Sequence, residues 1–212
     1  MSIPFTQEQF LDNIATYNLS VYPMQFVMYL LAGLALFMLF RKQAYSDRLI
    51  SAILAFFWIW MGIMYHIMNF ASINTTAYVF GVIFILQGLL FIRYGIIGKN
   101  LTFRLLPDRY GAIAILLLAY SLVFYHLFGN FIGHMYPAIP TFGLPCPTTI
   151  FTFGMLLLAP KVPRSLIIIP LLWAFIGGSA AFMFGILQDT LLLLMGLVAT
   201  VMILYREHRN EK

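Results

Sequence analysis

The dominant pattern along the chain is a series of apolar runs, most of them near twenty residues long, separated by short polar segments. An α-helix of about 20 residues crosses the roughly 30 Å hydrocarbon core of a bilayer. The runs cover residues 21–40, 49–70, 77–98, 110–128, 147–159, 165–184 and 187–205, and the fifth is unusually short. The pattern predicts an all-α integral membrane protein, a seven-helix transmembrane bundle formed by the single domain 1–212.

The basic residues test this count of spans, because cytoplasmic loops of membrane proteins collect Lys and Arg. All twelve Lys and Arg side chains lie near the connections after the first, third and fifth runs or after the seventh. Residues 1–20 and the other connections contain none. Removing the fifth span would place Lys161 and Arg164 on the wrong side. We therefore expect the N-terminus outside and the C-terminus inside.

Composition agrees with this class of protein. Hydrophobic residues make up 62% of the chain and charged residues only 9%, whereas soluble chains are about half apolar and about a quarter charged. This excludes a large extramembrane domain, and the single cysteine excludes a disulfide framework. The net charge of +5 follows the membrane topology, so we expect the lipid bilayer as a partner and no nucleic acid.

The N-terminal segment has no basic region of the kind that begins a signal peptide. Thr6 and Gln9 have the spacing of a capping box, and Phe5 and Phe10 lie where a hydrophobic staple would form. We therefore expect a short amphipathic helix over residues 7–16 at the outer membrane interface. It could be a lid over an outer cavity or a plain interfacial anchor, and the sequence favours the anchor.

The segment 129–147 contains three Gly and four Pro but no basic residue. It has too many prolines for a helix and is too apolar for a solvated loop. The 13 residues of the fifth run would rise only about 20 Å, which leaves roughly 10 Å of hydrocarbon unspanned. Pro147 suits the first position of the helix. We therefore expect the outer loop 129–146 to be buried or re-entrant and to line a cavity.

Polar and ionisable side chains are costly inside a membrane, so they mark candidate functional sites. In this chain they gather in the outer half of the predicted bundle. The candidate ligand- or pore-lining residues are His66, Asn69, Tyr125, His126, Asn130, Tyr136, Pro145, Cys146, Thr148, Thr149 and Asp189.

Three imidazoles and a thiolate are suitable ligands for Zn²⁺ or copper. The candidate metal ligands are His66, His126, His134 and Cys146, and haem ligated by His66 and His126 is a weaker alternative. The spacing matches no established metal motif. Each His can equally be an interhelical hydrogen-bonding residue, and Asp189 can be the N-cap of the seventh span.

Two classes of function fit this pattern. The first is a channel or transporter, or a binding protein, for a small solute or metal species at the outer half of the bundle. The alternative is an intramembrane metal- or haem-dependent enzyme that uses the same histidines and Cys146. Enzymatic activity is not favoured, because the chain has no GxSxG or HExxH motif and no carboxylate deep in a span.

Three stretches resemble a family of small bacterial polytopic membrane proteins of unknown function. They are PFTQEQF (4–10), WIWMGIMYHIMNFASIN (58–74) and PTFGLPCPTTIFTFG (140–154), and the third is the most specific. The resemblance extends along essentially the whole chain. It implies a multi-pass protein of the bacterial inner membrane and supplies no activity.

Overall fold

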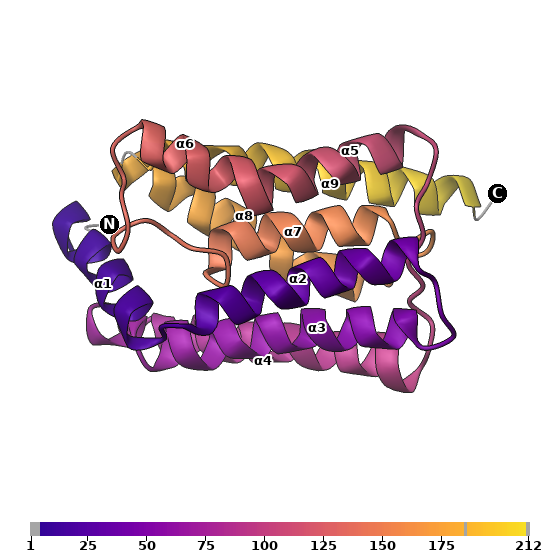
Figure 1. The fold of residues 1–212 in the computed structure, drawn as a ribbon, viewed down its shortest axis with the longest axis horizontal. Coiled ribbons are helices and arrows are strands. Elements are labelled where there is room, and N and C mark those ends of the chain that lie inside the picture. Colours follow the sequence, from indigo (N-terminus) through magenta and orange to yellow (C-terminus); the bar gives the residue numbers. More distant parts are fainter. Residues whose placement is uncertain (1–4, 185, 211–212) are drawn as a thin grey trace.

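The computed structural model describes residues 5–184 and 186–210, and every regular element within them is a helix (Figure 1). Most helices run side by side along one axis, while α1 (Gln7–Ser20) crosses one end of the bundle (Figure 1). The bend between α1 and α2 (Met24–Phe40) is 81°. We call this end of the bundle the α1 end, and the opposite end the C-terminal end.

Three of the long helices change their winding along their length. The helix α3 (Ser46–Trp60) continues into the π-helical η1 (Met61–Ile67) and the 3₁₀-helical η2 (Phe70–Ser72). The π-helical η3 (Ile92–Ile97) continues α4 (Ala77–Phe91), and the π-helical η4 (Tyr120–Phe124) joins α5 (Arg109–Ala119) to α6 (Tyr125–Phe131). The remaining helices are α7 (Pro145–Leu157), α8 (Ser165–Phe184) and α9 (Leu187–Asn210).

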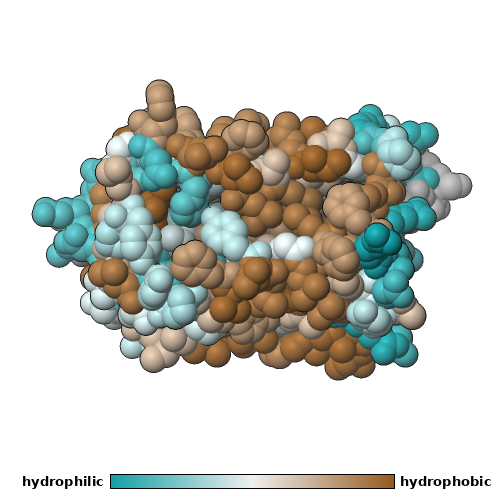
Figure 2. Space-filling view, in the orientation of Figure 1, coloured by the Kyte–Doolittle hydropathy of each residue, from teal (hydrophilic) through white to brown (hydrophobic). Residues whose placement is uncertain are grey.

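Five helices in the described part of the chain are long and apolar enough to cross a membrane. They cover Ser46–Ser72, Ala77–Ile97, Arg109–Phe131, Ser165–Phe184 and Asp189–Arg209, and the bent pair α1 and α2 would make a sixth span. Figure 2 shows an apolar band around the middle of the bundle and hydrophilic residues at both ends. Residues 1–4, 185, 211 and 212 of the predicted domain lie outside the described residues.

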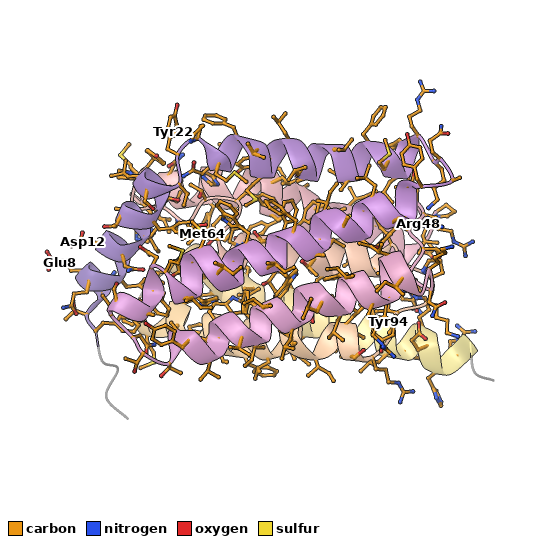
Figure 3. All side chains as sticks on the ribbon, turned by 90° about the horizontal axis from the view of Figure 1, so that it is seen from below. Glu8, Asp12, Tyr22, Arg48, Met64 and Tyr94 are labelled. Atoms are coloured by element: carbon orange, nitrogen blue, oxygen red, sulfur yellow. The ribbon has the colours of Figure 1, made fainter. Side chains whose placement is uncertain are left out.

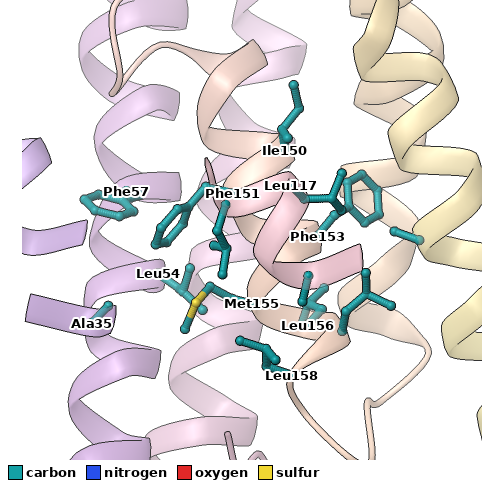
Figure 4. Packing of buried hydrophobic residues seen from close by; sticks show 14 of the residues in the cluster. Ala35, Leu54, Phe57, Leu117, Ile150, Phe151, Phe153, Met155, Leu156 and Leu158 are labelled. Carbon is teal, nitrogen blue, oxygen red and sulfur yellow. The ribbon is translucent and has the colours of Figure 1, made fainter. Parts of the chain in front are cut away.

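The short apolar helix α7 lies at the centre of the bundle (Figure 1). Its residues 147–157 are all buried. Figure 4 shows Phe151 and Met155 of α7 packed beside Leu54 and Phe57 of α3. Because other helices surround α7, its short length does not expose its own backbone to lipid.

The beginning of α7 differs from the prediction by two residues. The helix begins at Pro145, after Leu144 in an extended conformation, and not at Pro147. Pro145 already has the fixed φ of a first helical residue and needs no N–H partner. The predicted outer loop 129–146 is buried only in part. Residues 129–131 belong to α6, residues 132–138 are exposed or half-buried, and residues 139–144 are buried where the chain enters the bundle.

The predicted cap of the N-terminal helix is confirmed, although α1 is longer than the predicted 7–16. The backbone N–H of Thr6 donates to Gln9 Oε1 at 2.9 Å, and that of Gln9 donates to Thr6 Oγ1 at 3.2 Å. The rings of Phe5 and Phe10 stack with centroids 5.9 Å apart. The extra turn carries Tyr17 and Asn18, which are buried against the rest of the bundle.

Candidate binding site beneath helix α1

A cavity of about 580 Å³ lies at the α1 end of the bundle, between α1, the loop before α7, and helices α4, α8 and α9. We call it the aromatic cavity. Phe175 and Met183 of α8 belong to its lining and are exposed on the surface. The cavity therefore opens at the outer surface of α8. The aromatic residues of its wall are Phe5, Phe10, Tyr65, Phe70, Phe80, Trp173, Phe175 and Phe184.

Two rings from the N-terminal segment close one side of the aromatic cavity. Phe5 and Phe10 each stack on Phe184 of α8 with centroids 5.3 Å apart. Both also meet Phe70 edge-on, at 5.5 and 5.9 Å. Aromatic pairs of this geometry contribute about 1 kcal/mol each beyond the area they bury. These contacts favour the lid interpretation of α1, whereas the sequence favoured an interfacial anchor.

Hydrogen bonds from three asparagines fix α1 in this position. Asn69 Nδ2 donates to Asn13 Oδ1 at 2.8 Å, and Asn13 Nδ2 donates to the Asn69 carbonyl at 3.2 Å. Asn18 Nδ2 donates to the carbonyls of Pro137 and Ile139 in the loop before α7, at 2.7 and 2.8 Å. Asn69, predicted to line the cavity, therefore holds the helix that covers it.

A third polar contact joins α1 to the end of α3. The indole N–H of Trp60 donates to Tyr17 Oη at 2.9 Å. Burial raises the pKa of the Tyr17 phenol to about 12, so the hydroxyl remains protonated and neutral at physiological pH. Helix α1 is thus attached at its middle and its end by buried polar groups, in addition to the apolar contacts of Phe5 and Phe10.

The aromatic cavity also contains a buried carboxyl group. Asp189 lies in the first turn of α9, is 3% exposed, and lines the cavity together with Cys146. The hydroxyl of Tyr125, which is itself fully buried, donates to Asp189 Oδ1. The N-cap interpretation of Asp189 is wrong, because α9 begins at Leu187. Instead, the structure holds a hydrogen-bonded carboxyl group beside aromatic rings.

A donor without a partner lines the same cavity. The indole Nε1 of Trp173 is buried and has no hydrogen-bond partner among the described residues. A buried N–H without a partner costs about 1–3 kcal/mol. The aromatic cavity therefore offers a carboxyl group, Asp189, and an indole donor, Trp173, in walls that are mostly apolar apart from Asn74, Ser179 and Cys146.

His66 is fully buried directly behind this wall and is not part of the lining. Its ring lies 4.4 Å from Phe84 and 5.1 Å from Trp173, measured between centroids, and contacts Phe80 at 5.7 Å. Neither ring nitrogen has a hydrogen-bond partner in the described part of the chain. His66 thus supports the aromatic wall from behind.

The other predicted residues lie at several separate places. His126 is half-buried, with its Nδ1 3.2 Å from Tyr29 Oη. Asn130 and Tyr136 are exposed. Thr148 accepts a hydrogen bond from the Gly143 N–H at 3.0 Å and stabilises the turn before α7. Three residues of the predicted set line the aromatic cavity: Pro145, Cys146 and Asp189. Tyr125 does not line it but donates a hydrogen bond to Asp189. Thr149 is buried in α7.

The predicted metal ligands are not brought together. Within residues 5–184 and 186–210, no three His, Cys, Asp or Glu side chains form a group that could hold a metal ion. Cys146 lines the cavity, His66 is enclosed by rings behind it, and His126 contacts Tyr29. His134 lies in the loop after α6. His66 and His126, the ligands of the haem alternative, also have different surroundings.

The sequence interpretation did not identify the residues that form most of this site. Tyr65, Phe70, Phe80, Trp173 and Phe184 belong to a chain with 21 Phe and 12 Tyr, and nothing in their spacing distinguishes cavity rings from packing rings. A weak signal did exist for α1. Asn13, Ile14, Tyr17 and Asn18 recur at helical spacing, and they form its buried face.

The apolar spans, the buried central helix and the cavity between the helices define a multi-span helical membrane protein. The chain belongs to the DUF6064 family, described as a family of unknown function, which it matches over residues 7–212. This confirms the resemblance to an uncharacterised family. No curated protein and no solved structure matches the chain.

Proposed function

We propose that the chain is a seven-span protein of the bacterial inner membrane whose aromatic cavity faces the outer side and binds a small, largely apolar solute with an amino group. The solute binds between α1, α8 and the start of α9. The proposed activity is binding of this solute. If the protein is a transporter, the same site would bind the solute before it crosses the membrane.

The distribution of basic residues supports the seven-span topology. All Lys and Arg residues in the described part of the chain belong to helix ends and connections at the C-terminal end of the bundle. Figure 3 shows Arg48 at this end and the acidic Glu8 and Asp12 at the other. Because Lys and Arg accumulate on the cytoplasmic side, α1 and the aromatic cavity then face outward. In this topology α2 is the first span and α7, with its buried loop, is the fifth.

The single observation that carries the proposed function is the buried carboxyl group of Asp189 in an aromatic-lined cavity. A volume of about 580 Å³ falls within the range of about 300–1,000 Å³ that is typical of small-molecule sites. Aromatic faces attract organic cations, and an ammonium group can donate directly to a carboxyl oxygen. A compact apolar amine satisfies both features.

The core beyond the cavity supports binding more strongly than open conduction. Phe142 lies 5.4 Å from both Phe57 and Phe151, measured between ring centroids, and all three rings are buried. Figure 4 shows the next layer of side chains, which includes Leu54 and Met155. This conformation is therefore filled by side chains beneath the aromatic cavity, as expected of a binding site or of one closed state of a transporter.

Three probes with the same ring and different charge test this proposal. Benzylamine, benzyl alcohol and benzoate are added to the purified protein in lipid nanodiscs, and the melting temperature Tm is recorded. Ligands that bind only the folded state stabilise it by RT ln(1 + [L]/Kd). We expect benzylamine to raise Tm most and benzoate least.

Two variants and a control locate the effect. Asp189→Asn should remove the preference for benzylamine over benzyl alcohol, while Asp12→Asn, an exposed carboxyl group on α1, should retain it. Ala180→Phe places a ring in the cavity lining and should abolish the response to all three probes. The proposal fails if the probes shift Tm equally in the wild type and in Ala180→Phe, because the shift would then come from partition into lipid.

A further inference from the structure

A second cavity, of about 700 Å³, lies at the C-terminal end of the bundle. It is formed by the chain that leads into α5, the first turn of α5, the link between α7 and α8, and the end of α9. We call it the arginine pocket. Its lining residues are Arg104, Leu106, Asp108, Arg109, Tyr110, Pro160, Arg206 and Arg209.

The arginine pocket is lined by four arginines and one acidic residue. Its one acidic residue, Asp108, caps α5 by accepting hydrogen bonds from the backbone N–H groups of Tyr110 and Gly111, at 2.9 and 3.1 Å. An ion pair joins Lys42 to Asp47, outside the pocket. Within residues 5–184 and 186–210, no carboxylate forms an ion pair with any of the four guanidinium groups that line this cavity.

Two of these guanidinium groups are held in place by the same aromatic ring. The Arg206 Cζ atom lies 4.8 Å from the centroid of Tyr110, and the Arg109 Cζ atom lies 5.4 Å from it. Arg109 is also 5.4 Å from the centroid of Tyr205. Cation–π contacts fix the positions of the two cations but do not neutralise them. Their mutual repulsion favours an anion in the space that they share.

Arg206 is also anchored by the backbone. It is 8% exposed, and its Nη1 and Nη2 atoms donate to the carbonyls of Leu157 and Ala159 at the end of α7, at 2.8 and 2.5 Å. Arg104, Arg109 and Arg209 are exposed. The arginine pocket therefore combines one rigid, buried guanidinium group with three that remain accessible to a ligand.

We propose that the arginine pocket binds a phosphate group, carried either by an anionic phospholipid or by a soluble phosphate compound. Guanidinium groups bind phosphate oxygens through paired, charge-assisted hydrogen bonds. Basic pockets at the end of a transmembrane bundle are suited to lipid head groups, which lie at the same depth. This inference does not depend on the aromatic cavity, which lies at the opposite end of the bundle.

The test compares two double variants that remove the same charge from the same end of the protein. Arg104→Gln with Arg209→Gln removes two exposed arginines from the pocket. Arg41→Gln with Arg48→Gln removes two exposed arginines outside it. Native mass spectrometry then measures the binding of phosphatidylglycerol and of phosphatidylcholine to each protein in detergent. In parallel, Tm is measured with inorganic phosphate and pyrophosphate, at matched ionic strength in chloride.

Binding of phosphatidylglycerol should weaken about tenfold or more in the pocket variant, because two of the guanidinium groups that face the head group are removed, and should be nearly unchanged in the control. This result identifies a lipid head group. A Tm increase with pyrophosphate that only the pocket variant loses identifies a soluble phosphate compound instead. Equal losses in both variants, or no phosphate-dependent signal in the wild type, would overturn the proposal.

Discussion

The two ends of the bundle contain cavities of similar size and opposite chemistry. The aromatic cavity at the α1 end has rings for walls and a single carboxyl group, Asp189, whose partner is the hydroxyl of Tyr125. The arginine pocket at the other end is lined mainly by charged residues, and its buried Arg206 is bound by backbone carbonyls. In each cavity, one buried polar group is held by the protein itself.

This difference follows from the hydrogen bonds that the two buried groups, the Arg206 guanidinium and the Asp189 carboxyl, can form. A guanidinium group has five N–H donors, so it can bind two carbonyls and still face a cavity. The Asp189 carboxyl group accepts hydrogen bonds, and the hydroxyl of Tyr125, the first residue of α6, donates one to it. The comparison shows that each cavity contains one buried polar group held by hydrogen bonds, with mostly apolar walls at the α1 end and mostly charged walls at the C-terminal end.

The largest expected effect is at the C-terminal end. Arg206→Gln removes the guanidinium group that binds the carbonyls of Leu157 and Ala159 and contacts Tyr110. Two buried carbonyls then lose charge-assisted hydrogen bonds, so we expect the free energy of unfolding to fall by about 3 kcal/mol. Chemical or thermal unfolding without phosphate or anionic lipid measures this loss.

Arg209→Gln is the matched control for that measurement. Arg209 lines the same pocket but is exposed, so its substitution should change stability by less than about 0.5 kcal/mol. Equal losses in the two variants would show that Arg206 contributes only its charge, and that the α7 carbonyls do not depend on it.

A smaller effect is expected at the α1 end. Tyr125→Phe removes the hydroxyl that donates to Asp189 and leaves the buried carboxyl group without that donor. We expect a loss of about 2 kcal/mol, and the loss should shrink in an Asp189→Leu background, because a double-mutant cycle removes the shared interaction. Tyr78→Phe, on the exposed surface of α4, serves as the control. Additive losses would contradict the paired arrangement of Tyr125 and Asp189.

The smallest effect concerns the lid. Thr6→Ala breaks the capping box with Gln9 at the start of α1, which should cost about 1 kcal/mol of local helix stability. Because Phe5 and Phe10 flank this turn, hydrogen exchange of the α1 amides should become faster while that of the α7 amides stays the same. Thr75→Ala, in the turn before α4, is a comparison that leaves α1 intact. Unchanged exchange in α1 would mean that docking alone fixes the helix.

Several features of the fold could be predicted from the sequence because they depend on local chemistry. The capping box of Thr6 and Gln9 requires only residues three positions apart. Five of the seven apolar runs became long helices, since membrane length and hydropathy act on consecutive residues. The short helix after the Gly/Pro-rich loop was also expected, although it begins at Pro145 instead of Pro147.

The candidate site was predicted less well, because depth along a helix does not determine which direction a side chain faces. His66, Cys146 and Asp189 lie toward the same end of the bundle, yet only Cys146 and Asp189 share the aromatic cavity. The ring of His66 instead packs behind the wall against Phe84 and Trp173. A set of ligands that is plausible by depth can thus be separated by the rotation of single helices.

The class of protein follows from the linear chain, because the apolar content and the distribution of Lys and Arg do not depend on how the helices pack. Which polar groups meet depends on the tertiary structure. Tyr125 and Asp189 are far apart in sequence and hydrogen-bonded in space. The same holds for Arg206 and the carbonyls of Leu157 and Ala159. Such pairs depend on the packing angles and rotations of whole helices, which are set by many weak apolar contacts and leave no periodic signal along the chain.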